Sequence, residues 1–182
     1  MASSIPDHFA LFGLEPRFAL DAGLLDIAYK RVQDKVHPDR FAGGTPAERR
    51  IAVQWAARAN EALQTLRSPV RRAAYLCELN GVALGAESNT VMPPAFLMQQ
   101  LEWREALAEA AKAADPHALD VLARQTDSAR AGLVDDLTRA IDADRDFVRA
   151  SALVRQLMFV DKMRDEIERV RHAQVEAPSD MG

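Results

Sequence analysis

The fold of this 182-residue chain is organised around the stretch Tyr29-Lys30-Arg31-Val32-Gln33-Asp34-Lys35-Val36-His37-Pro38-Asp39-Arg40-Phe41. Apolar residues before Pro38 recur at helical spacing, whereas a proline lacks an N–H and pushes the residue before it out of the helical region. The stretch therefore predicts a helix that ends in a turn, with His37 and Asp39 exposed side by side. Such a tripeptide arises by chance in roughly one chain per hundred of this length, so its surroundings decide its meaning.

The predicted helix begins at Asp21, whose carboxylate can cap it. One face of this helix is apolar and is formed by Leu25, Ala28, Tyr29, Val32 and Val36. Another face carries Lys30, Arg31 and Lys35, which gives the helix a basic exterior leading to His37. Asp34 lies at pairing distance from Lys30 and Arg31 and reduces the net charge of this face.

The segments that flank this helix carry their own start signals. Thr45-Pro46-Ala47-Glu48 combines a cap, a first-turn proline and a capping box, and predicts a second long helix. Its small inner residues would let it pack closely against the first helix as an antiparallel partner. A short helix is expected after Asp7, and another from about 70 to 79 after Ser68-Pro69, with Arg71 and Arg72 pointing outward.

Residues 81–92 lack helical phasing and contain two glycines, which predicts a linker between domains. Three long helices are expected beyond it, at about 94–114, from Pro116, and from near Asp144. Short connections make neighbouring helices antiparallel and so predict a three-helix bundle. The expected organisation is all-α, with domains at 1–80 and 93–175, joined by the linker and followed by a disordered tail at 176–182.

The composition limits the possible functions. Hydrophobic residues make up 48% of the chain and aromatic residues 6%, which favours a folded helical protein. Residues 1–80 hold 11 Lys and Arg against 9 Asp and Glu, and the remainder holds 12 against 18. Neither half has the basic excess typical of nucleic-acid binding. The single cysteine, Cys77, excludes an internal disulfide. With no apolar run of membrane-spanning or signal-peptide length, we expect a cytoplasmic protein.

The helix at about 94–114 carries an apolar pair outside its buried stripe. Setting Phe96 at zero, Leu97 and Leu101 fall about 100° to 140° away, and Glu102, Glu105 and Glu109 follow on the far face. Apolar residues beside a row of carboxylates predict a partner site. Packing at the edge of the core is the alternative for the two leucines. Phe159 likewise lies off the main inward stripe of the last helix.

Residues 7–80 resemble a J-domain. The likeness rests on the basic helix, the His37-Pro38-Asp39 turn and the passage from Ala62-Leu63-Gln64-Thr65-Leu66-Arg67-Ser68-Pro69 to Arg72-Ala73-Ala74-Tyr75. Three further segments resemble the HscB-type co-chaperones of iron–sulfur cluster assembly: Asp7-His8-Phe9-Ala10-Leu11-Phe12-Gly13-Leu14, Ala95-Phe96-Leu97-Met98-Gln99-Gln100-Leu101-Glu102 and Phe159-Val160-Asp161-Lys162. The resemblance covers nearly the whole chain.

The resemblance implies an adaptor with two partners, a DnaK/HscA-type ATPase chaperone and the scaffold protein on which iron–sulfur clusters are built. His37, Pro38 and Asp39, with Lys30, Arg31 and Lys35, would bind the chaperone and trigger its ATP hydrolysis. Leu97, Leu101 and Phe159 would form the apolar centre of the scaffold site, and Glu102, Glu105 and Glu109 its rim. Arg40 stands where lysine is common, and the cysteine pairs of some eukaryotic relatives are missing, so no cofactor or metal is expected.

Three alternatives remain. A J-domain protein could serve a different client, and a helical scaffold could lack a chaperone partner altogether. An enzyme would need a constellation such as His37 with Asp39, or Cys77 with a histidine. The four histidines are scattered along the chain, however, and no phosphate loop or metal-ligand spacing is present.

Overall fold

The structure is a computed structural model that describes residues 6–41, 43–85 and 92–176. Within these ranges the regular structure is helical, which confirms the all-α prediction. The elements are α1 (His8–Phe12), α2 (Ala22–Val36), the 3-10 turn η1 (Pro38–Phe41), α3 (Pro46–Arg67), α4 (Pro69–Leu79), α5 (Pro94–Ala113), α6 (Pro116–Thr138), the π-helical turn η3 (Arg139–Ala143) and α7 (Phe147–Glu176). Helix α7 includes the first residue of the predicted tail, and residues 86–91 of the predicted linker and 177–182 of the tail lie outside the described ranges. No helix in the described ranges is long and apolar enough to cross a membrane.

The predicted caps begin their helices. The Asp7, Asp21, Ser68 and Asp115 side chains each accept a backbone N–H from the first turn that follows. At α3, the Glu48 N–H donates to the Thr45 hydroxyl over 3.3 Å, and the Thr45 N–H donates to the Glu48 carboxylate over 2.7 Å. This is the predicted capping box, and it fixes the start of α3 directly after the turn.

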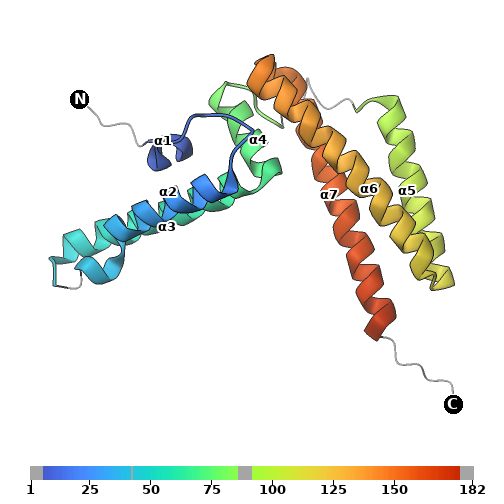
Figure 1. The fold of residues 1–182 in the computed structure, drawn as a ribbon, viewed down its shortest axis with the longest axis horizontal. Coiled ribbons are helices and arrows are strands. Elements are labelled where there is room, and N and C mark those ends of the chain that lie inside the picture. Colours follow the sequence, from blue (N-terminus) through green and yellow to red (C-terminus); the bar gives the residue numbers. More distant parts are fainter. Residues whose placement is uncertain (1–5, 42, 86–91, 177–182) are drawn as a thin grey trace.

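Helices α2 and α3 form an antiparallel hairpin (Figure 1). Buried alanines on α3, such as Ala59 and Ala62, bring the helix close to Leu25 and Ala28 of α2. The Tyr29 hydroxyl donates to Asn60 Oδ1 over 2.7 Å and so ties the two helices on one side. The hairpin therefore holds the end of α2 at a fixed place.

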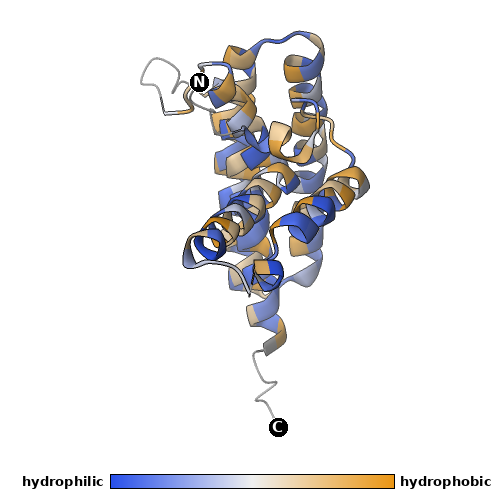
Figure 2. Cartoon of the chain, turned by 90° about the vertical axis from the view of Figure 1, so that its left-hand side faces the viewer, coloured by the Kyte–Doolittle hydropathy of each residue, from blue (hydrophilic) through white to orange (hydrophobic). Residues whose placement is uncertain are grey.

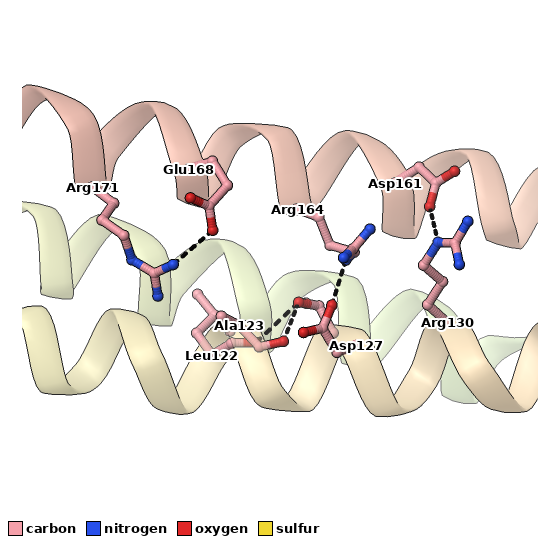
Figure 3. A network of polar contacts seen from close by, with 9 residues as sticks. Leu122, Ala123, Asp127, Arg130, Asp161, Arg164, Glu168 and Arg171 are labelled. Atoms are coloured by element: carbon pink, nitrogen blue, oxygen red, sulfur yellow. Dashed lines mark hydrogen bonds and ion pairs between the residues drawn. The ribbon is translucent and has the colours of Figure 1, made fainter.

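Helices α5, α6 and α7 make the second half of the molecule, and α6 and α7 pack most extensively. Their shared face carries three cross-helix ion pairs, two of them drawn in Figure 3: Arg130 with Asp161, Asp127 with Arg164, and Asp120 with Arg171. From each of these pairs to the next, the residue number on α6 falls by the same amount as the residue number on α7 rises. The ion pairs thus match the antiparallel register, while each exposed pair adds only about 0.2–1 kcal/mol. Buried leucines and valines supply the larger stabilisation.

The two halves share one hydrophobic core because α4 packs against α7. The Cys77 thiol is fully buried there, with Sγ 3.7 Å from the Phe147 carbonyl oxygen, and burial raises its pKa to about 11. The prediction that Arg72 points outward is wrong. Its guanidinium is half-buried 5.1 Å over the Phe18 ring and donates to the Leu66 carbonyl, and burial lowers its pKa.

Asp142 links η3 to the loop that precedes α2. Its carboxylate accepts the backbone N–H groups of Phe18 and Ala19 over 2.7 and 2.8 Å, and Arg17 lies 3.9 Å away. The Asp142 side chain is only 13% exposed. This contact joins residues more than a hundred positions apart and fixes the first half of the chain against the bundle.

Candidate functional site

The predicted turn follows α2 directly. His37 ends the helix with an extended backbone, φ −59° and ψ 127°, as expected for a residue before proline. The Asp39 N–H donates to His37 Nδ1 over 3.3 Å, and Asp39 Oδ2 lies 3.5 Å from the same nitrogen. The turn therefore presents the His37 imidazole and the Asp39 carboxylate to a partner, with side chains 53% and 89% exposed.

Arg40 holds this turn against the helix. Its Nη1 donates to the Asp34 carbonyl oxygen over 2.6 Å, one of the carbonyls that the end of α2 leaves without a partner in the helix. The Arg40 N–H also donates to the His37 carbonyl over 3.0 Å. The presence of arginine where lysine is common does not by itself predict this contact, although a basic residue just past a helix end is a known capping signal.

The basic face of α2 is exposed at Lys30, Arg31 and Lys35. The expected pairing of Asp34 with Lys30 or Arg31 is missing from the ion pairs between described side chains. The three cations thus remain available on the face that leads to the turn, where they can steer an acidic partner.

The outer face of α5 combines apolar and acidic groups as predicted. Leu97 is 50% exposed and Leu101, one turn later, is 51% exposed. Met98 beside them is 58% exposed, which places it on the surface and not in the core. Glu102, Glu105 and Glu109 are exposed as well, and Gln99 Nε2 donates to the Glu102 carboxylate over 3.1 Å. Three large apolar side chains therefore adjoin a row of carboxylates.

Phe159 on α7 lies at the edge of this face. Its ring is half-buried and meets the Phe96 ring edge-on, with centroids 5.9 Å apart. The Arg104 guanidinium covers the same ring at 5.5 Å from its centroid. Arg104 lies about 20° from Leu97 around α5, on the side towards Phe96, so the ring borders the leucine side of the face. Phe159 thus packs against the core with part of its ring and leaves the rest exposed at the surface.

The turn and the α5 face lie at opposite ends of the molecule (Figure 1). Viewed along the hairpin in Figure 2, hydrophobic and hydrophilic residues alternate along the helices. The two surfaces therefore do not overlap. None of the described residues forms a group of three or more His, Cys, Asp or Glu side chains that could hold a metal ion.

Comparisons with known proteins agree with one another. Residues 92–168 match the family model described as the HSCB C-terminal oligomerisation domain. The chain is 52% identical to a co-chaperone protein HscB homolog of Burkholderia mallei over 176 residues, 94% of this chain and 100% of the relative. A Bordetella pertussis homolog is 52% identical over 161 residues, 88% of this chain and 94% of the relative.

Solved structures show the same fold. Chaperone HscB from Vibrio cholerae is matched with a TM-score of 0.81 at 35% identity, over 93% of this chain and 99% of that chain. The human co-chaperone protein HscB gives a TM-score of 0.84 at 25% identity, over 91% and 82%.

Proposed function

Because this chain belongs to the HscB family of co-chaperones, we propose that it binds an iron–sulfur cluster scaffold protein, delivers it to a DnaK/HscA-type chaperone and stimulates that chaperone's ATPase. One observation carries the proposal: the exposed His37-Pro38-Asp39 turn and the exposed apolar and acidic face of α5 occur together, at opposite ends of one chain of this family.

The chaperone would bind at the end of α2. Lys30, Arg31 and Lys35 would orient an acidic surface, an effect mainly on association rate and direction. The His37 imidazole and the Asp39 carboxylate would make the directional contacts. Pro38 restricts the turn, and Arg40 ties it to α2, so little conformational entropy is lost when the partner docks.

The scaffold would bind on α5. Leu97 and Leu101, with the rim of Phe159, supply an apolar centre, and Glu102, Glu105 and Glu109 supply a charged border. The acidic border suits a scaffold whose contact surface is basic. Scaffold and chaperone would then be held on one protein, which favours transfer of the cluster to acceptor proteins and their maturation.

The chaperone half of the proposal is tested by single-turnover ATP hydrolysis by the cognate chaperone. Wild type should accelerate hydrolysis, and His37→Gln should lose the acceleration while its circular dichroism spectrum stays unchanged. Equal stimulation by the variant would exclude the turn as the activating element. No stimulation by wild type would favour a helical scaffold without a chaperone partner.

The scaffold half is tested by calorimetry with the purified scaffold protein. Replacing both Leu97 and Leu101 by alanine should weaken scaffold binding at least tenfold. Each substitution removes about half of the free energy that a leucine side chain contributes when a partner buries it. Leu79→Ala on α4, 43% exposed, is the matched control and should bind as wild type. Normal chaperone stimulation without scaffold binding would indicate a different client.

A further inference from the structure

The first half of α2 carries an exposed apolar pair that the proposed function leaves unused. Leu24 is 58% exposed and Ile27 is 48% exposed. Residues three apart on a helix are neighbours, so the two side chains form one small surface. Single exposed apolar residues are common. Two large ones together on the outward face of a charged helix favour a covering partner.

This pair is continuous with the basic face. Arg31 lies one turn beyond Ile27, and Lys35 lies one turn beyond Arg31, two residues before His37. At 3.6 residues per turn, Leu24, Ile27, Arg31 and Lys35 fall within about 80° of one another around α2. Leu25, on the buried side of the helix, lies about 80° to 160° from these four residues, and Ala28 lies at the border between the buried side and the stripe. The apolar pair and the cations thus form one stripe that ends at the turn.

We propose that the ATP-bound DnaK/HscA-type chaperone covers Leu24 and Ile27 when it docks on the basic face and the turn. This inference rests on the proposed function and extends its chaperone site by two helical turns towards the start of α2. The cations and the apolar pair would contribute differently to binding. Exposed cations mainly govern encounter and orientation, whereas buried apolar area governs how long the complex lasts. The matching chaperone surface is acidic where it meets Arg31 and Lys35, with an apolar patch beside it.

Alanine substitutions separate this role from that of the turn. Alanine is the best helix former, so Leu24→Ala and Ile27→Ala leave α2 intact. Each removes aliphatic carbons from a side chain that is about half exposed, which predicts a rise of about fivefold in the co-chaperone concentration for half-maximal stimulation, and more than tenfold for the double variant. The stimulated rate at saturation should match wild type because His37 and Asp39 are unchanged.

Ile51→Ala is the matched control. Ile51 is 53% exposed on α3 and lies half a turn around that helix from Asn60, which bonds to α2. It should leave the half-maximal concentration unchanged. The experiment titrates the full chain into single-turnover ATP hydrolysis by the cognate chaperone, with His37→Gln in parallel.

A raised half-maximal concentration with an unchanged plateau supports the inference. A concentration within twofold of wild type for the double variant overturns it, and leaves the proposed function standing as long as wild type stimulates and His37→Gln does not. A change in oligomeric state by light scattering, with unchanged chaperone affinity, would assign the pair to contact with a second copy of this chain and would also overturn it.

Discussion

Replacing Asp142 by alanine should destabilise the junction between the two halves of the molecule. The change removes one carboxylate that accepts two backbone N–H groups, from Phe18 at 2.7 Å and Ala19 at 2.8 Å. Hydrogen bonds to charged acceptors contribute about 1.5–3 kcal/mol each. The Ala19 N–H can turn to water, whereas Phe18 is 1% exposed and its N–H loses its partner in a partly buried place. We therefore expect a loss of about 2–4 kcal/mol in the free energy of unfolding.

The assay is urea unfolding followed by tryptophan fluorescence. The chain has one tryptophan in each half, Trp55 on α3 and Trp103 on α5, so Trp103→Phe and Trp55→Phe backgrounds report the two halves separately. In wild type, both reporters should show the same transition because α4 and α7 share one core. With Asp142→Ala, the Trp55 transition should move to lower urea.

Asp144→Ala is the matched control. Asp144 lies two residues further on, is 47% exposed and pairs only with the half-exposed Arg149 among the ion pairs of the described residues. The Asp144→Ala substitution should lower the free energy of unfolding by no more than about 1 kcal/mol, the range of surface ion pairs. A loss for Asp142→Ala no larger than that for Asp144→Ala would refute the reasoning from the two backbone hydrogen bonds.

Three shorter predictions concern other residues. Cys77, with a pKa of about 11, should be only about one part in a thousand thiolate at pH 8 and should react with a thiol reagent far more slowly in native protein than in urea; equal rates would contradict its burial. Burial lowers the pKa of His8, which stacks on Tyr75, so the stabilising effect of the neutral His8 side chain is present above pH 6.5 and is lost as the pH falls through the lowered pKa. The variant His8→Phe should flatten the dependence of the free energy of unfolding on pH in that window. An unchanged slope would assign the dependence to other groups. Arg40→Ala should release the Asp34 carbonyl and weaken chaperone stimulation severalfold with the helical content of the protein nearly unchanged; stimulation equal to wild type would mean that the turn needs no such tie.

The sequence alone determined the features that depend on neighbours in the chain. Helix starts at Asp21, Thr45 and Ser68 follow from capping, which involves side chains and N–H groups within three residues. The turn at His37 follows from the geometry of proline. The exposure of Leu97 and Leu101 follows from helical period, because a residue's angle around a helix is fixed by its number.

Only the tertiary structure decided the features that depend on how helices cross. Packing against the loop that precedes α2 turned Arg72 inward over Phe18, although helical period alone placed that arginine outside. The packing of α4 on α7 buried Cys77 beside Phe147. The bonds from Asp142 to Phe18 and Ala19 join distant parts of the chain and leave no periodic or capping signal. Local patterns record which face of a helix is apolar, but not which partner covers it, because that depends on the packing of the whole chain.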